Sequence, residues 1–452
     1  MKSNLYKEYE DYHKKISRLS EASLSDLELV AITSATNAIY NPRLKDQKIT
    51  NKKPAGFKKT LTLFRDFLYL LLSMPGIAKL YFSNNVSIVW SGDFYDDSTQ
   101  GDFRLGNFYK NADKEKLKYI EFITSSNYGF LKSFKNYFRR KRLIIFFDAI
   151  SRIFKLFQNK EIDLENFDDF CKEDQKIIYE NISNILATYK FLEIFKPHAI
   201  KNIFLWEISS RTSGIFYWAK KNNIKTIGIM HGLPIKEYMY YETMPGLVFK
   251  DHLRLDTYGV WSEYWKNYYE ENSTMFDCLE VSGPLRAKGK FSKSQGTKIL
   301  LLIEPLLDTK EIDKYASLIN SFYDKITIKV RSDFRPEQLN KYYECMPNLQ
   351  KCMIESGSIE ELLKTEKFGY FIATHSTAIQ DCLHFGLRPI LLSTSTWGNY
   401  LNIEEKFICK NQDDIKLCFN KNHIYNNEIE ELAYRFSRPG DGSKWIVKKL
   451  KL

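Results

Sequence analysis

Two apolar runs of this 452-residue chain end beside side chains that can transfer protons or carry charge. Residues 225–230 stop at His231, and a glycine and a nearby proline then prevent the run from continuing as a central strand. The preceding run, residues 199–205, ends beside Glu207. Imidazole and carboxylate groups act as general bases, and carboxylates also act as nucleophiles. His231 and Glu207 are therefore candidate catalytic residues.

A third run, residues 86–90, leads into a polar loop that contains Asp93, Asp96 and Asp97. By the same geometry one of these three acids, with Asp93 first, is a further catalytic candidate. Simpler interpretations stay open for all of them. A carboxylate can be a charge at a helix start or in a solvated loop, and a histidine can simply complete a strand end.

The candidates need a fold that brings strand ends together, and the chain around them predicts one. A strand over 199–205, a helix that opens near Ser209 and a strand over 225–230 form a βαβ unit. The strands of such a unit are parallel, so their carboxyl ends lie at one edge of the sheet. We therefore expect Glu207 and His231 at the same edge.

The second half of the chain predicts another sheet of this kind. Apolar strands are expected at 298–303, 325–330, 351–355, 369–373 and 388–392, with helices such as 311–322 and 376–384 between them. The expected fold class is α/β, with two doubly wound, Rossmann-like domains. The predicted organisation is a helical N-terminal extension (1–82), a first domain (83–286), a linker (287–297) and a second domain (298–452). Within the first domain, a helical stretch is expected up to about residue 195.

A helix start in the second domain has the residue types of a phosphate site. Strand 369–373 leads through His375 into Ser376 and Thr377, which open the predicted helix 376–384. Free N–H groups and the helix dipole at such an end attract anions, and two hydroxyls add donors. Ser376 can equally be only the N-cap of this helix.

The charge of the chain suggests an anionic partner. Its formal net charge is +11, and cations interleave with aromatic residues between residues 132 and 142. An anionic membrane surface or an acidic glycan suits this stretch, whereas nucleic acid is ranked last because no nucleic-acid-binding motif accompanies the charge. A solvated helix face is the simple alternative. Residues 61–77 are apolar but contain Arg65 and Asp66 and are broken by Pro75, which predicts a buried or interfacial helix rather than a membrane span.

The termini and cysteines bear on the compartment. The N-terminus has no apolar core of a signal peptide, and the seven cysteines are scattered without metal-binding spacing. We expect a cytoplasmic protein, peripheral at the inner face of the membrane, with no bound metal. The sequence also has neither a Rossmann dehydrogenase glycine motif nor a P-loop.

Several motifs in this order resemble GT-B glycosyltransferases of bacterial surface polysaccharide synthesis. They are the His-Gly strand end at His231, the Val-Ser-Gly-Pro-Leu-Arg turn that contains Gly283, and the Ser-Thr-Ala helix start at Ser376, followed by Phe-Gly-Leu-Arg-Pro. The resemblance covers about residues 199–410. Similar proteins include polysialyltransferases, Kdo transferases and teichoic-acid glycerophosphotransferases. The resemblance implies a sugar-transfer reaction. The expected donor is a CMP-linked acidic sugar such as Kdo or sialic acid, and the expected acceptor is a capsule, lipopolysaccharide or other surface glycan or glycolipid.

The resemblance also implies where the donor binds, and no cofactor beyond that donor. Its phosphate is expected at Ser376 and Thr377, with His375 and Gly283 as further contacts. The related enzymes carry Lys-x-His-Pro after the second strand of this domain, whereas this chain has Arg331 and Arg335 there. Guanidinium groups pair well with phosphate oxygens, so these arginines can take over the clamp, or they are ordinary surface residues. A CDP-polyol phosphotransferase of teichoic-acid type and a non-catalytic binding subunit stay open as alternatives.

Overall fold

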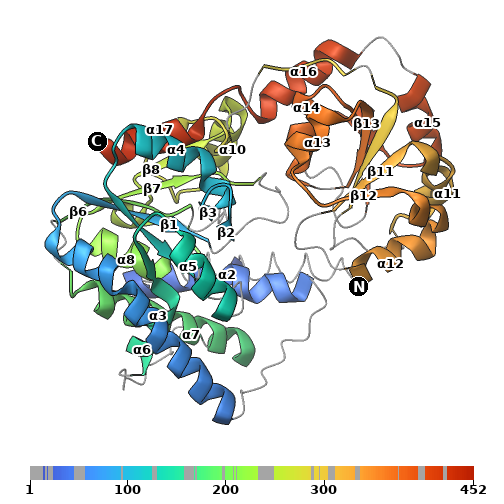
Figure 1. Ribbon diagram of the computed structural model, residues 1–452. Helices are drawn as coiled ribbons and strands as arrows, with labels where there is room; N and C mark the ends of the chain where they lie inside the picture. Colours follow the sequence, from blue (N-terminus) through green and yellow to red (C-terminus); the bar gives the residue numbers. More distant parts are fainter. Residues whose placement is uncertain are drawn as a thin grey trace.

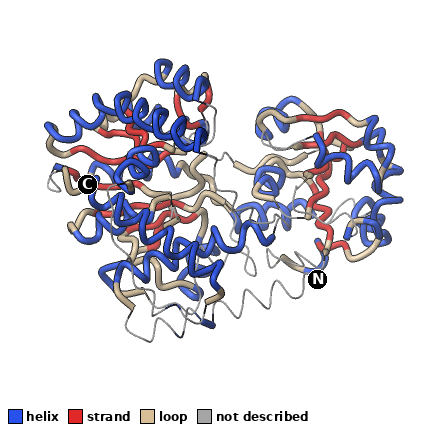
Figure 2. Tube along the Cα trace, turned by 90° about the horizontal axis from the view of Figure 1, so that it is seen from below, coloured by secondary structure: helices blue, strands red, loops and turns tan. Residues whose placement is uncertain are grey.

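The computed structural model describes most of the chain, in segments. These segments are residues 14–15, 18, 24–44, 56–92, 95–124, 130–156, 167, 170–195, 199–206, 208–209, 211–232, 249–286, 290–294, 296–303, 311–330, 336–374, 376–394, 403–420 and 425–452. Two groups of strands lie in two separate lobes, each enclosed by helices (Figures 1 and 2).

The first lobe contains a seven-stranded sheet in which all neighbouring strands are parallel, in the order β5-β4-β1-β6-β7-β8-β9. Its strands are β1 (Val86–Ser91), β4 (Tyr119–Ile123), β5 (Ile144–Phe146), β6 (Ile200–Phe204), β7 (Lys225–Ile229), β8 (Thr257–Val260) and β9 (Leu279–Val281). A small antiparallel hairpin, β2 (Tyr95–Asp96) and β3 (Gly101–Asp102), follows β1.

The second lobe contains a six-stranded parallel sheet with the order β12-β11-β10-β13-β14-β15. Its strands are β10 (Lys298–Leu302), β11 (Ile326–Lys329), β12 (Met353–Glu355), β13 (Phe368–Ala373), β14 (Arg388–Leu392) and β15 (Ile408–Cys409). Counted along the chain, both sheets follow the doubly wound order 3-2-1-4-5-6, which the first sheet extends by one strand. The predicted fold class, α/β with two Rossmann-like domains, is confirmed.

Helices cover both sheets. In the first lobe they are α2 (Asp26–Leu44), α3 (Gly56–Phe82), α4 (Gly106–Lys114), α5 (Phe130–Arg139), α6 (Phe147–Lys155), α7 (Lys172–Leu192), α8 (Ser213–Lys221) and α10 (Glu263–Asn272). In the second lobe they are α11 (Asp313–Ser321), α12 (Pro336–Cys345), α13 (Ile359–Thr365), α14 (Ala378–His384), α15 (Gln412–Asn420) and α16 (Tyr425–Phe436). In the predicted N-terminal extension, α2 packs on α7 and α8, and α3 packs on β5 and α6.

The last helix, α17 (Gly442–Lys451), belongs in space to the first lobe although it ends the chain (Figure 1). It packs against α4, β6 and β7. The segment that leads into it is bonded to both lobes, because Phe436 O accepts from Trp265 Nε1 at 2.8 Å and Ser437 O lies 2.7 Å from His384 Nε2. The chain therefore crosses between the lobes twice.

Each sheet has one point where the chain changes direction of winding. It lies between β1 and β6 in the first sheet and between β10 and β13 in the second. In doubly wound sheets, ligands bind in the crevice at the carboxyl ends of the two strands that flank this point. The loops after β1, β6, β10 and β13 are therefore where a site is expected.

The predicted helical stretch before residue 195 is wrong in part, because β4 and β5 lie within it. β4 has no uninterrupted apolar pattern, since a buried glutamate, Glu121, stands at its centre. β5 has only three residues and follows a cationic stretch. Short parallel strands of this kind are specified by their neighbours in the sheet more than by their own sequence.

The expected break at Pro75 is also wrong, because α3 continues through it to Phe82. Pro75 is exposed, and the next residue, Gly76, lies so close to β5 that a β-carbon there would be 2.7 Å from Ile144 O. Among the described residues one segment, Leu61–Phe82, is long and apolar enough to cross a membrane by length and composition, and 22% of its most apolar window is buried.

Candidate functional site

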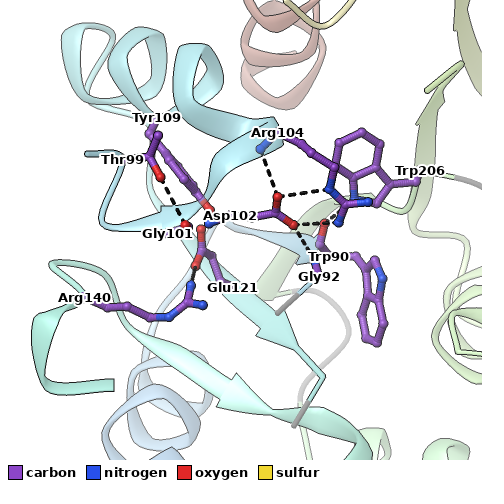
Figure 3. A network of polar contacts seen from close by, with 10 residues as sticks. All are labelled: Trp90, Gly92, Thr99, Gly101, Asp102, Arg104, Tyr109, Glu121, Arg140 and Trp206. Carbon is purple, nitrogen blue, oxygen red and sulfur yellow. Dashed lines mark hydrogen bonds and ion pairs between the residues drawn. The ribbon is translucent and has the colours of Figure 1, made fainter. Parts of the chain in front are cut away.

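Two tryptophans connect the ends of β1 and β6, the neighbouring strands between which the winding of the first sheet changes direction. Trp90 is the last residue but one of β1, and Trp206 lies two residues after the end of β6. The Trp206 indole Nε1 donates to Trp90 O at 3.0 Å (Figure 3). Trp206 has a φ of 20°, which is rare for a bulky residue and indicates that the surrounding contacts hold its backbone in place. This hydrogen bond holds the ends of β1 and β6 together.

A buried carboxylate, Asp102, fixes the loop that follows β1. Its oxygens accept from Gly92 N at 2.9 Å, from Arg104 N and Nε at 3.0 Å each, and from Arg104 Nη2 at 2.6 Å (Figure 3). Asp102 is completely buried, and its own N–H donates to the Tyr109 hydroxyl at 3.0 Å. Buried charges are tolerated when they are paired and hydrogen-bonded in this way. We call Asp102, Arg104 and Tyr109 the Asp102 cluster.

The Asp102 cluster reaches the candidate catalytic residues through aromatic contacts. The Arg104 guanidinium lies over the Trp206 ring at 4.8 Å, and the Trp206 ring meets the His231 imidazole edge to face at 5.9 Å. His231 is exposed just beyond β7. Trp206 therefore lies between the Arg104 guanidinium and an exposed imidazole at the carboxyl edge of the sheet.

A second buried ion pair involves β4, the strand next to β1 in the sheet. Glu121 on β4 is completely buried, and its Oε2 lies 3.2 Å from Arg140 Nη1, whose side chain is buried as well. Burial raises the pKa of the Glu121 carboxyl, and the positive charge of Arg140 opposes that rise. The Tyr109 hydroxyl interacts with the Glu121 carboxyl and so links this pair to the Asp102 cluster. The Arg142 guanidinium lies 3.9 Å from the centroid of the Tyr109 ring.

These contacts change the interpretation of the basic stretch at 132–142. Arg140 pairs with the buried Glu121. Arg142 is largely buried over the Tyr109 ring and pairs at its end with the exposed Asp113, so neither arginine belongs to an exposed cationic surface. Lys132, Lys135 and Lys141 are exposed. The sequence pattern could not separate these two groups, because alternation of cations with aromatic residues is the same for both.

In the second domain, the predicted phosphate-binding residues stand at the start of α14, after β13. Ser376 Oγ accepts from Ala378 N, the first residue of α14, at 3.2 Å, so this hydroxyl satisfies one free N–H of the helix start. The N-cap position itself is Thr377, whose side chain makes no capping hydrogen bond. Thr377 is exposed. A β-carbon on Gly232, beside His231, would lie 3.8 Å from Thr377 Oγ1. The structure therefore brings a strand end of the first sheet and a helix start of the second together.

Other predicted residues are placed differently. Gly283 has a φ of +75°, and a β-carbon there would be 3.0 Å from Gly440 Cα, so close packing against the segment before α17 requires a glycine. Asp96 Oδ1 accepts from Ser98 N at 2.8 Å, and Asp97 pairs with Arg139 at 2.8 Å. The remaining candidates lie outside the described residues; they are Asp93, Glu207, Arg331, Arg335 and His375.

Sequence reasoning missed Asp102, Arg104, Tyr109, Glu121 and Arg140. One signal was available, because a glutamate inside the apolar strand sequence Tyr-Ile-Glu-Phe-Ile needs a buried partner. Its partner lies 19 positions away and could not be named from spacing. Among the described residues, no group of three or more His, Cys, Asp or Glu side chains is arranged to hold a metal ion.

No protein-family model and no curated protein matches the chain, whereas several solved structures do. The UDP-GlcNAc 2-epimerase from Neisseria meningitidis bound to UDP-GlcNAc is 13% identical, with 81% of this chain and 99% of that chain covered and a TM-score of 0.47. The S. aureus MnaA-UDP co-structure is 11% identical, with 81% and 96% covered and a TM-score of 0.46. A mutant of S. aureus TarM in complex with Fondaparinux, alpha-GlcNAc-glycerol and UDP is 11% identical, with 81% and 99% covered and a TM-score of 0.44. Likeness at this level concerns the fold alone.

Proposed function

We propose that this chain is a glycosyltransferase that moves a sugar from a nucleotide donor on the second domain to an acceptor on the first. The observation that carries the proposal is the approach of Gly232 to Thr377 across the two domains. Each residue lies beyond the carboxyl end of a strand, where doubly wound sheets bind ligands. Two substrates bound at these edges would have their reacting atoms next to each other, as a transfer reaction requires.

The chemistry falls to the residues at the edge of the first sheet. Glu207 serves as the base for the acceptor hydroxyl or as the nucleophile, with Asp93 as the alternative. His231 orients the sugar or the phosphate. The Asp102 cluster fixes the loop after β1 and the position of Trp206. The charged groups of the cluster therefore need little reorganisation during the reaction.

The donor on this proposal is a CMP-linked acidic sugar such as Kdo or sialic acid, and the acceptor is a bacterial surface glycan or glycolipid. The motifs at His231, Gly283 and Ser376 support this assignment, as does the net charge of +11. Arg331 and Arg335 would pair with the donor phosphate in place of the histidine that the related sequences carry.

The test is nucleotide release from a panel of CMP-, CDP- and UDP-sugars with glycan and glycolipid acceptors. We expect CMP release that depends on the acceptor. A phosphodiester in the product, seen by phosphorus NMR with a CDP-polyol donor, would replace sugar transfer by polyol-phosphate transfer. Donor binding without turnover for every pair would instead identify a non-catalytic binding subunit and refute the enzyme proposal.

A further inference from the structure

Two polar side chains of helix α3, Asp66 and Ser73, point inward. Asp66 is buried and accepts from Arg152 Nε at 2.7 Å and Nη2 at 2.8 Å. Ser73, also buried, accepts from Phe146 N at 2.9 Å, and Gly76 lies against the β5 backbone. One face of α3 is therefore attached to the domain along most of its length by hydrogen bonds, an ion pair and close packing.

The opposite face of α3 is apolar and exposed. Its side chains recur at helical spacing and have exposed fractions of 62% for Phe64, 52% for Phe67, 51% for Leu71, 48% for Met74 and 83% for Phe82. A helix on the surface of a globular protein normally has the reverse arrangement. A continuous exposed apolar row of this kind marks an interaction surface. We call these five residues the apolar stripe.

Helix α5 lies beside α3, since Tyr69 of α3 and Tyr137 of α5 both pack against the Phe146 ring, at centroid distances of 4.4 and 6.1 Å. On its outer side α5 exposes Phe134 and Phe138, whose rings are 5.0 Å apart. The two helices meet on their inner sides at Phe146, and each exposes apolar or aromatic side chains outward.

Exposed lysines accompany this surface. Lys132 and Lys135 lie on α5, Lys141 follows it, and Lys79 lies near the end of α3. We call these four residues the basic flank. The two helices together contain a single acidic residue, Asp66, and it is buried in its ion pair. The surface therefore combines exposed apolar side chains with positive charge and has no exposed acid on either helix.

We propose that α3 and α5 dock the protein on an anionic lipid bilayer. The apolar stripe enters the boundary between headgroups and acyl chains, and the basic flank contacts the lipid phosphates. The helix lies in the plane of the surface and does not span it, because its inner face carries the ion pair of Asp66 with Arg152. The docking is independent of the proposed transfer chemistry.

A second copy of the chain fits this surface less well. In a symmetric dimer through α3 and α5, the same patch would face itself, so the lysines of both copies would come together, and neither helix has an exposed acid to offset their charge. A bilayer with anionic headgroups supplies both the apolar depth and the negative charge that the surface lacks.

The first test uses the unaltered full chain and vesicles of phosphatidylcholine, with and without phosphatidylglycerol. We expect the chain to cosediment with the anionic vesicles and to bind the neutral ones much more weakly. Hydrogen exchange with anionic vesicles present should slow selectively in α3 and α5. This measurement needs no substitution, so it remains decisive if a variant fails to fold.

The second test separates the two contributions to binding. Phe64→Gln, Phe67→Gln and Leu71→Gln together should weaken vesicle binding by at least about 100-fold at every salt concentration, because apolar burial is lost. Lys132→Gln, Lys135→Gln and Lys141→Gln together should weaken it about 100-fold at low salt and little at high salt.

Matched variants elsewhere on the surface control for hydrophobicity and charge. Met353→Gln with Leu417→Gln removes exposed apolar residues from the second domain, and Lys325→Gln, Lys364→Gln and Lys367→Gln remove exposed lysines there. Neither set should change vesicle binding. Equal binding to neutral vesicles, binding to soluble acidic glycans but not vesicles, or a dimer that only the α3 variant disrupts would each overturn the proposal.

Discussion

The two sheets share a winding order but differ in what stands at their carboxyl edges. At the edge of the first sheet, charged side chains are buried and paired, with Asp102 bound to Arg104 and Glu121 to Arg140 below it. At the described edge of the second sheet, Ser376 and Thr377 offer neutral hydroxyls at a helix start. The same topology therefore supports two tasks: the first edge holds charges in fixed positions, and the second offers hydrogen-bond donors.

The largest expected effect tests whether chemistry belongs to the first edge. Glu207→Gln should slow sugar transfer by about 10²–10⁴-fold, the usual contribution of a general base, and leave donor affinity unchanged. Initial rates and calorimetric donor binding measure the two quantities. A near-normal rate in this variant, with Asp93→Asn or His231→Ala inactive, would assign the chemistry to another strand end.

The next effect concerns the stability of the first edge. Arg140→Met leaves the Glu121 carboxylate buried without its ion-pair partner and should lower the free energy of unfolding by about 3–5 kcal/mol at neutral pH. Adding Glu121→Leu to this variant should restore most of the lost free energy of unfolding, because neither charge of the buried ion pair then remains. Urea titration of both variants measures this, and equal losses would contradict the pairing.

The pH dependence of the Arg140→Met variant follows from the raised pKa of Glu121. Without Arg140 the folded-state pKa rises further above the ordinary value of 4.5, so the folded state binds a proton more tightly than the unfolded state. The loss of unfolding free energy in Arg140→Met, relative to the unaltered chain, should therefore shrink as the pH falls through the folded-state pKa of Glu121 toward 4.5. Unfolding titrations between neutral and mildly acidic pH would show the trend, and a deficit that grows with acid would contradict it.

A smaller effect is expected for Asp102→Asn, which keeps the shape of the side chain but removes its charge. Hydrogen bonds to a charged group contribute about 1.5–3 kcal/mol, so the unfolding free energy should fall by about that amount. Hydrogen exchange should rise selectively around Gly92. If only global stability changed, Asp102 would not be the residue that fixes this loop.

The smallest effect belongs to the second edge. Thr377→Ala together with Ser376→Ala should weaken nucleotide binding by about 1–3 kcal/mol, the scale of charge-assisted hydrogen bonds. Ser376→Ala alone should also destabilise the domain by about 1 kcal/mol, because Ser376 Oγ satisfies one free N–H at the start of α14. Thr377→Ala serves as the control that leaves the hydrogen bond from Ala378 N to Ser376 Oγ intact. Unchanged calorimetric affinity in the double variant would remove the donor phosphate from this helix start.

The fold was largely predictable wherever strands are apolar throughout. All five strands predicted in the second domain are present. Four of them, β10, β11, β13 and β14, are largely buried and form continuous apolar runs, as strands inside a parallel sheet do, whereas β12 is an exposed edge strand. β4 escaped prediction because its central glutamate is compensated only in three dimensions, and β15 because it has two residues.

The site was predictable only at the level of strand ends. The sequence pattern put His231 and Ser376 after strands, and the structure agrees. The approach of Gly232 to Thr377 depends on how the domains face each other, and no local pattern encodes it. The Asp102 cluster likewise depends on the short hairpin after β1, in which Gly101 leaves room for the Tyr109 ring.

The return of α17 to the first lobe has a consequence for how such a chain can be cut or recombined. A fragment that stops at residue 286 would lack a helix that covers α4, β6 and β7, so an apolar surface of its own core would be open to water. The second domain is therefore an insertion within the first rather than its sequel. Exchange of the second domain between related chains would have to replace an internal segment and keep residues 442–451 with the first domain.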